Sequence, residues 1–306
     1  MKFSRKIILK PRDIWWEKNG VFNPAISEYN NKTYMVYRAV GLDHISRFGL
    51  AISEDGEHFQ VFDNPVLEAG DDNICERLGI EDPRLTKIDN KYYITYTGVS
   101  VYLADHVGPC APSLNTPGVP WKIRVSAYST TDFNKFNYMG ILLKDIDSKN
   151  AALLPHKIAG QFALFHRINP NIYLSYSKDL KRWTGNLEIM RSEHIWEKLK
   201  VGIACPPIQT DKGWLMIYHG VDEHKVYRMG AALLDLGNPA HVIKRTKHPI
   251  LEPELAWEKN GFVNNVIFVT GCVQRDDMLW LYYGAADTVV GLVKIPLSYI
   301  FEKLDE

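Results

Sequence analysis

The stretch IDNKYYITYTGV, residues 88–99, begins with a tight-turn pair and continues as a strand of alternating aromatic and aliphatic residues. The same unit occurs four more times, as YNNKTYMVYRAV at 29, IAGQFALFHRI at 158, TDKGWLMIYHGV at 210 and RDDMLWLYYGAA at 275. A second strand follows most copies, and helical periodicity is scarce. Repeats of roughly 50 residues with several strands each are typical of propeller blades. The sequence therefore predicts an all-β fold, a five-bladed β-propeller in a single domain over residues 1–306.

Each repeat ends its first strand with residues that include polar side chains. The five endings are Tyr37-Arg38, Tyr96-Thr97, Phe165-His166-Arg167, Tyr218-His219 and Tyr283-Gly284. Because a propeller gathers strand ends around a central channel, we expect these groups to converge in one pocket. The alternative is that they cap strands or bond the backbone of neighbouring blades.

The composition of the chain limits the classes of partner that it is expected to bind. Lys+Arg and Asp+Glu both number 36, and no basic block marks a surface for nucleic acid or anionic membrane. No apolar run is long enough to span a bilayer. No two of the four cysteines are spaced as a C-x-x-C motif, so neither a zinc site nor a disulfide framework is indicated. We expect a cytoplasmic protein with no nucleic-acid or membrane partner and no metal.

In the stretch EDPR, residues 81–84, Asp82 directly precedes Pro83. Pro83 fixes its own φ and is expected to push Asp82 toward extended geometry, so that the backbone aims the carboxylate. Arg84 would then lie on the same face, close enough to orient Asp82 or to bind the same ligand. The alternative is a structural Asp-Arg pair at a turn.

Nine motifs occur in order along the chain: FNPA at 22, YRAV at 37, EDPR at 81, KNAALLPHKIAGQFALFHR at 149, WEKLKVG at 196, GWLMIYHGVD at 213, YRMGAALLDL at 227, PILEPE at 249 and YYGAADT at 282. Together they resemble glycoside hydrolase family 130, the β-mannoside phosphorylases and their hydrolytic relatives. The resemblance runs from about residue 15 to about residue 295. It implies a five-bladed β-propeller, in agreement with the repeat count.

The resemblance also implies a reaction. Asp82 matches the family's general acid, whose proton is thought to pass through the 3-hydroxyl of a mannose ring to the glycosidic oxygen. Inorganic phosphate, the co-substrate, is the nucleophile, and inversion would release α-mannose 1-phosphate without any cofactor. The phosphate ligands carry over to Lys149, Arg167, Lys200 and His219.

By the same resemblance, further residues are expected to bind the sugar or to support the pocket directly. They are Asn23, Arg38, Arg47, Arg84, Asp222, Tyr227, Arg228 and Asp287. For Asp222 and Asp287 turn chemistry is an equal alternative, since aspartate favours turns. Similarity to the shorter members of the family indicates β-1,2-linked oligomannosides as substrates. Homo-oligomer formation stays open.

Two other functions remain at this point. A hydrolytic β-mannosidase would keep Asp82 as the acid and use Asp222 or Asp287 to activate water. A sugar-binding propeller would hold an oligosaccharide without turnover. The insertion at 101–125, with four prolines and two glycines, is predicted to be a loop that lines or covers the site.

Overall fold

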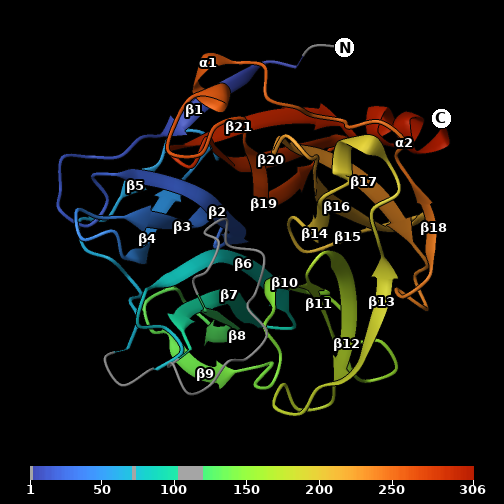
Figure 1. The fold of residues 1–306 in the computed structure, drawn as a ribbon, viewed down its shortest axis with the longest axis horizontal. Coiled ribbons are helices and arrows are strands. Elements are labelled where there is room, and N and C mark those ends of the chain that lie inside the picture. Colours follow the sequence, from blue (N-terminus) through green and yellow to red (C-terminus); the bar gives the residue numbers. More distant parts are fainter. Residues whose placement is uncertain (1–2, 71–73, 103–119) are drawn as a thin grey trace.

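The computed structural model of the chain describes residues 3–70, 74–102 and 120–306. Five antiparallel sheets lie around a common centre in chain order (Figure 1). The first blade consists of β2 (Gly20–Tyr29), β3 (Lys32–Val40), β4 (Ser46–Ser53) and β5 (Gln60–Val61). The second consists of β6 (Ile80–Ile88), β7 (Lys91–Val101), β8 (Trp121–Thr130) and β9 (Asn137–Ile141).

The other three blades follow the same plan. The third consists of β10 (Lys149–Leu153), β11 (Phe162–Ile168), β12 (Asn171–Ser177) and β13 (Thr184–Met190). The fourth consists of β14 (Lys200–Ile203), β15 (Ile208–Thr210), β16 (Gly213–Val221), β17 (Tyr227–Leu234) and β18 (Val242–Arg245). The fifth consists of β19 (Ile267–Arg275), β20 (Met278–Ala285), β21 (Val289–Pro296) and β1 (Arg5–Leu9). The predicted five-bladed β-propeller is confirmed.

The first strand of each blade lies toward the axis, as Figure 1 shows for β2, β6, β10, β14 and β19. The repeated turn pairs of the sequence connect these inner strands to the next strands. At the first such turn Asn30 and Asn31 both have positive φ, 50° and 59°, which matches the right-handed twist of a two-residue hairpin.

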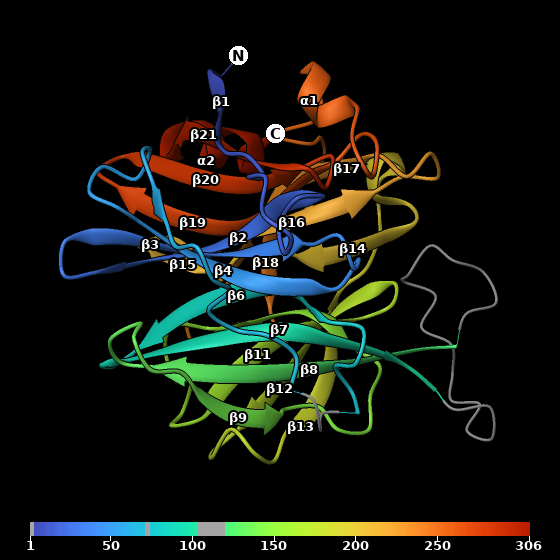
Figure 2. The ribbon, with the colours of Figure 1, turned by 90° about the vertical axis from the view of Figure 1, so that its left-hand side faces the viewer.

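The amino-terminal strand closes the ring. Strand β1 pairs antiparallel with β21, so the first ordered strand of the chain is the outermost strand of the last blade (Figure 2). This pairing satisfies the backbone hydrogen-bonding groups at the edge of β21, to which another strand could otherwise add. The described helical segments are short: η1 (Ile195–Glu197), α1 (Ala256–Lys259) and α2 (Leu297–Asp305). None of these described helices is long enough to cross a membrane.

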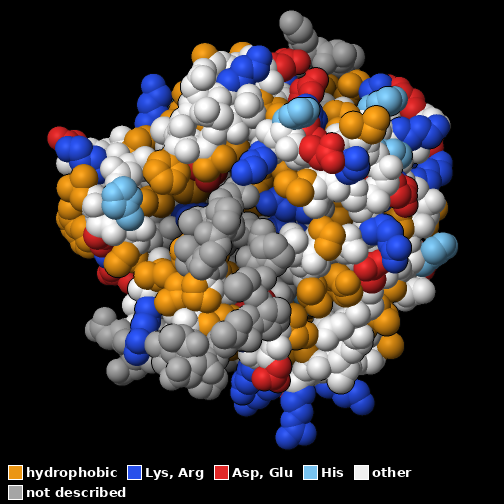
Figure 3. Space-filling model, viewed as in Figure 1, with side chains coloured by type: hydrophobic (Ala, Val, Ile, Leu, Met, Phe, Trp, Pro, Cys, Tyr) orange, Lys and Arg blue, Asp and Glu red, His pale blue; other side chains and the backbone are white. Residues whose placement is uncertain are grey.

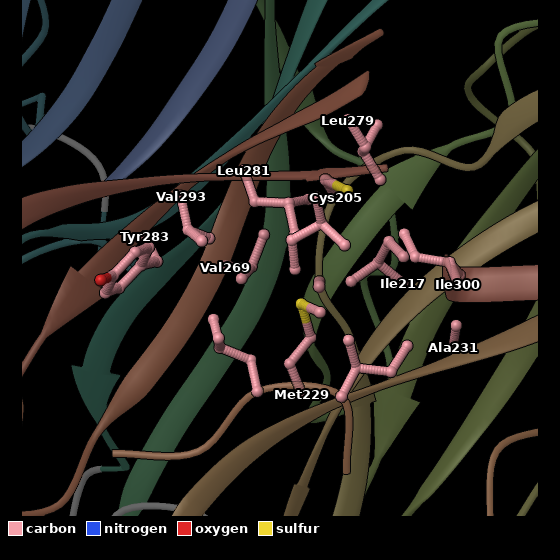
Figure 4. Close-up of a cluster of buried hydrophobic side chains, with 14 of the residues drawn as sticks. Cys205, Ile217, Met229, Ala231, Val269, Leu279, Leu281, Tyr283, Val293 and Ile300 are labelled. Carbon is pink, nitrogen blue, oxygen red and sulfur yellow. The ribbon is translucent and has the colours of Figure 1, made fainter. Parts of the chain in front are cut away.

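Apolar faces of neighbouring blades pack together between the sheets. The largest cluster lies between the fourth and fifth blades, where Ile217 and Met229 meet Val269 and Leu281 (Figure 4). Ile300 of α2 joins this cluster, so the carboxy-terminal helix covers it from outside. The core therefore fills the gaps between blades and leaves the inner strands free to carry polar groups.

A buried glutamate accepts a hydrogen bond from a tyrosine hydroxyl in three of the blades. The pairs are Glu17 with Tyr37 at 3.0 Å, Glu76 with Tyr96 at 2.8 Å and Glu258 with Tyr283 at 2.8 Å. Each glutamate lies in the segment that leads into an inner strand, and each tyrosine lies on the strand beside it. In the fourth blade Arg245 contacts both Glu197 and Tyr218.

These glutamates were not singled out from the sequence, although a signal exists. The tripeptide W-E-K recurs at 16–18, 196–198 and 257–259, each time before an inner strand. The third blade has Phe165 at the position of the tyrosine, which removes the hydroxyl and hence the need for the acceptor. The repeated pair therefore belongs to the scaffold, where it joins the entry of a blade to its second strand.

Replacing Tyr283 with Phe tests this role. The variant should lower the free energy of unfolding by about 1–3 kcal/mol, because the fully buried Glu258 loses a hydrogen-bond donor. Tyr176→Phe is the matched control, since the hydroxyl of Tyr176 has no hydrogen-bond partner among the described residues, and it should change stability by less than about 0.5 kcal/mol. Urea unfolding followed by circular dichroism measures both. Equal losses of stability in the two variants would show that the hydrogen bond between Tyr283 and Glu258 does not stabilise the fold.

Candidate active site

Three neighbouring inner strands carry a bulge at the same level. Strands β2, β6 and β10 each show one register shift against the next strand. The bulged residues Asn23, Asp82 and Asn150 have φ values of 49°, 54° and 51°. A bulge breaks the alternation of side chains and re-aims one of them. All three side chains line the same cavity of about 270 Å³ at the axis.

The expected extended geometry of Asp82 is therefore wrong. Its φ is positive, and the bulge of β6 rather than a straight strand directs the carboxylate. Arg84 also acts differently from the expectation: its Nη1 donates to the backbone oxygen of Asp82 at 2.7 Å, and its Nε donates to the oxygen of Ala204 at 2.9 Å. Arg84 supports the pocket by tying the second blade to the fourth.

The Asp82 carboxylate is held by two donors. Its Oδ1 accepts from Asn23 Nδ2 at 2.7 Å and from Arg38 Nη1 at 3.1 Å. Burial alone would raise the pKa of Asp82, but the positive charges of Arg38, Lys149 and Arg84 outweigh burial and lower the pKa. In the free protein Asp82 is thus an ionised, oriented carboxylate.

A second carboxyl group in the cavity has the opposite environment. Burial, with the negative charges of Asp82 and Glu81, raises the pKa of Asp287 to about 7, although Arg38 opposes the shift. Arg38 divides its guanidinium between the two acids of the EDPR stretch, because Nη2 donates to Glu81 at 2.6 Å. Neighbouring carboxyls with separated pKa values are typical of catalytic sites.

Basic side chains also gather at this cavity. Lys149, Arg167, Lys200 and His219 are 8%, 3%, 4% and 1% exposed, and none forms an ion pair with a carboxylate of the described residues. Arg167 Nε and His219 Nδ1 are buried without a hydrogen-bond partner in that part of the chain. Lysine and arginine side chains, in blue, are visible near the middle of the face in Figure 3. Unpaired buried donors of this kind fit an oxyanion.

A glycine makes the close approach of two of these groups possible. Arg167 Nη1 lies 3.2 Å from His219 Nε2. A side chain at Gly202 would place its Cβ 2.6 Å from His219 Nε2 and 3.2 Å from Arg167 Nη1. Glycine at this point of β14 therefore leaves the room that the basic cluster occupies.

The structure brings most of the predicted residues together. The cavity is lined by Asn23, Arg38, Asp82, Lys149, Arg167, Tyr227 and Asp287. His219 touches Arg167, and Lys200 lies over the ring of Tyr227, with Nζ 5.2 Å from the ring centre. The convergence of strand ends expected from the repeat is thus observed for Arg38, Arg167 and His219.

Three predicted residues lie elsewhere. Arg47 donates to Asp43 at 2.6 Å and Glu68 at 2.8 Å, and it lines a different surface hollow. Asp222 pairs with Arg228 at 2.7 Å, and neither is among the residues that line the cavity.

Turn chemistry, the alternative reading, accounts for Asp222. Its Oδ1 accepts from the backbone N–H groups of His224 and Val226.

The insertion at 101–125 can be assessed only in part. Residues 103–119 lie outside the described residues. Val101 ends β7, and residues 121–125 begin β8, so the strands extend further into the insertion than the loop prediction allowed. The two strands pair as far as Val101 and Trp121. Trp121 lines the cavity, as predicted for the insertion.

Sequence reasoning missed several residues that line the cavity, among them Glu81, Asn150 and Phe262. Asn150 had a signal, because KNAA at 149 parallels FNPA at 22 and EDPR at 81. In each case the second residue of the four is the bulged one. Phe262 had none, since nothing local distinguishes an aromatic residue at a cavity mouth from one in a core.

The sequence profile of glycoside hydrolase family 130, described as beta-1,4-mannooligosaccharide phosphorylase, matches residues 4–306. This chain belongs to glycoside hydrolase family 130. It is 44% identical to a beta-1,2-mannobiose phosphorylase of Thermoanaerobacter sp. (strain X514) over 310 residues that cover 96% of each chain. It is 39% identical to a 1,2-beta-oligomannan phosphorylase of the same strain, with 98% of each chain covered.

A solved structure agrees with this placement in family 130. The structure of the beta-1,2-mannobiose phosphorylase from Listeria innocua with beta-1,2-mannobiose superposes with a TM-score of 0.86 at 28% identity. The superposition covers 100% of this chain and 99% of that one. The family resemblance inferred from the motifs is confirmed.

Replacing Arg84 with Met tests its role behind the site of this family 130 protein. The variant should lower the free energy of unfolding by about 3 kcal/mol, because buried carbonyl oxygens of two blades lose their donor. Arg47→Met, whose carboxylate partners are more exposed, should cost about 1 kcal/mol or less. Thermal and urea unfolding give both values, and a smaller loss for Arg84 than for Arg47 would contradict the assignment.

Proposed function

We propose that this protein is an inverting phosphorylase that cleaves β-1,2-linked oligomannosides with inorganic phosphate and releases α-mannose 1-phosphate. The observation that carries the proposal is the cluster of Lys149, Arg167, Lys200 and His219, buried and without carboxylate partners among the described residues. Lys149 and Arg167 line the cavity of Asp82, while His219 contacts Arg167 and Lys200 lies over the ring of Tyr227. The β-1,2 linkage is that of the phosphorylases from Thermoanaerobacter and Listeria to which the chain is similar.

In the proposed reaction an oxygen of phosphate attacks the anomeric carbon while the bond to the leaving sugar breaks. The basic cluster holds the phosphate and offsets its charge. Asp82 supplies the proton that the leaving oxygen takes up, passed through the 3-hydroxyl of the reacting mannose as the family resemblance implies. No cofactor takes part.

Phosphate also prepares the acid in this scheme. Lys149 is one of the charges that lower the pKa of Asp82 in the free protein. A phosphate dianion beside Lys149 offsets that charge, so the pKa of Asp82 rises when the nucleophile binds. The low pKa of the free state is therefore compatible with an acid that acts only in the phosphate complex.

A second cavity, of about 330 Å³, adjoins the first and fits the leaving group. The two share Arg38, Glu81, Trp121, Phe262 and Asp287, whereas the basic cluster contributes only to the first cavity. Inversion places the nucleophile and the leaving group on opposite faces of the reacting sugar. We therefore assign the leaving sugar to the second cavity, which Phe22, Val40, Leu78 and Val99 make largely apolar.

Hydrolysis is less well supported. Asp222 is engaged by Arg228 and by backbone donors, which leaves it poorly placed as a base toward water. Asp287 has a pKa of about 7 that would suit a base, but it also lines the second cavity, to which the basic cluster does not contribute. A non-catalytic sugar-binding role would not account for the oriented carboxylate of Asp82 or for the buried cations without carboxylate partners among the described residues.

The proposed function is tested by incubating the purified protein with β-1,2-mannobiose, with and without phosphate. Mannose 1-phosphate should form only with phosphate, and Asp82→Asn should lower the rate by at least about a hundredfold, the range of general acid catalysis. Asp222→Asn is the matched control and should retain most of the activity. Free mannose formed equally without phosphate would replace the proposal with hydrolysis, and no turnover with intact sugar binding would favour the binding propeller.

Phe262 tests the assignment of the leaving-group side. Its side chain is 74% exposed, yet its backbone is fixed, because Phe262 N donates to Thr288 Oγ1 and Val263 N donates to Ala286. Phe262→Ala should raise the KM for the acceptor sugar in the synthetic direction about fivefold to tenfold, the effect of losing one aromatic face, and leave the KM for phosphate in phosphorolysis unchanged. Phe62→Ala, an exposed aromatic outside both cavities, is the control. Equal effects on acceptor and phosphate would contradict the assignment.

A further inference from the structure

The basic cluster contains more potential charge than its surroundings can balance. Lys149, Arg167, Lys200 and His219 come from β10, β11, β14 and β16, which bring them together at one side of the cavity. A buried cation without a partner is costly, so some of these groups have to give up a proton in the free protein. The geometry shows which ones do.

His219 is neutral, as its contact with Arg167 requires. The guanidinium of Arg167 is always protonated and can only donate, so His219 Nε2 at 3.2 Å has to be an acceptor. The histidine proton is then on Nδ1, which is buried and has no partner among the described residues. His219 can offer this N–H to an oxyanion without carrying charge.

Lys200 differs from Lys149 in the charges that face it. Lys149 lies near the carboxylates Glu81 and Asp82, which favour its ammonium form. Lys200 faces Arg167, Lys149 and Lys225, and its Nζ lies over the ring of Tyr227.

No described residue accepts a hydrogen bond from the amine of Lys200. Burial, followed by the three neighbouring cations, lowers its pKa to about 6. The hydroxyl of Tyr227 stays protonated, since burial raises its pKa to about 12.

We propose that Lys200 is an uncharged amine in the free protein and takes up a proton from solvent when phosphate enters the site. A bound dianion offsets the repulsion that the three neighbouring cations exert on Lys200. Its attraction for positive charge favours the ammonium form of Lys200. Lys200 would then charge only when its ligand is present, so the free protein never has to bury the full set of cations. The inference rests on the proposed function only in naming phosphate as the ligand.

The affinity of the site for an anion depends on pH through the charge of Lys200. Below a pH of about 6 Lys200 is charged in both states, and anion binding takes up no proton through it. Above that pH the free amine is neutral and the complex is charged, so affinity falls as pH rises, by about tenfold per pH unit. Arg38, Arg84 and Arg167 stay charged over this range and add no slope. Asp82 and Asp287 lie in the same cavity, and a bound dianion raises the pKa of each carboxyl, so they add proton uptake of their own that the variants separate from that of Lys200.

Titration calorimetry with sulfate measures the proton uptake, because the charge of sulfate does not change between pH 6 and 9. Binding at pH 7.5 is compared in two buffers of different ionisation enthalpy. The wild-type protein should take up at least about one proton per sulfate, and the dissociation constant should rise at least about tenfold between pH 7 and pH 8. No uptake in the wild-type protein would overturn the proposal.

Two variants identify the group. Lys200→Arg keeps a permanent charge and should take up about one proton fewer per sulfate than the wild-type protein, whereas Lys149→Met should bind more weakly and keep the proton taken up by Lys200. Proton uptake in Lys200→Arg equal to that of the wild-type protein would overturn the assignment to Lys200. Failure of the proposed function is a separate result, since a protein that forms no mannose 1-phosphate can still show linked sulfate binding.

Discussion

The hydrogen bond between a buried glutamate and a tyrosine hydroxyl holds the segment that enters a blade against the second strand of that blade. It occurs at Tyr37, Tyr96 and Tyr283, and Arg245 contacts both members of the corresponding pair in the fourth blade. A buried carboxylate tolerates few other arrangements, because losing a partner leaves it unsatisfied in a dry interior. In these blades the pairs thus hold the start of the inner strand, and two of the bulges that shape the site, in β2 and β6, lie on strands anchored in this way.

The interior of the ring holds more basic groups than its carboxylates pair with. Arg38 binds the two acids of the EDPR stretch and Lys149 lies near the same acids, while Arg167, Lys200 and His219 have no carboxylate partner among the described residues. Arg84 uses its donors on backbone oxygens of two blades. Because these acceptors are backbone carbonyls, Arg84 holds the geometry without forming an ion pair with an acid of the site.

This surplus of basic groups suits a nucleophile that carries its own negative charge. An inverting hydrolase needs a carboxylate base to activate water, whereas phosphate needs only donors that position it and balance its charge. In this family 130 chain, lysine, arginine and histidine side chains without carboxylate partners among the described residues can supply such donors.

The sequence by itself determined the number of blades, the family and most residues of the cavity, because turn pairs, alternating strands and ordered motifs are local patterns. Only the tertiary structure decided the left-handed bulge at Asp82, the separate location of Arg47 and the engagement of Asp222 with Arg228.

Those features depend on register between strands and on partners far apart in the chain, such as Arg84 and Ala204, which no local pattern encodes. The same holds for the unpaired state of Lys200. A lysine looks identical in sequence whether it is solvated or buried among other cations, and only packing removes the water that would keep it charged.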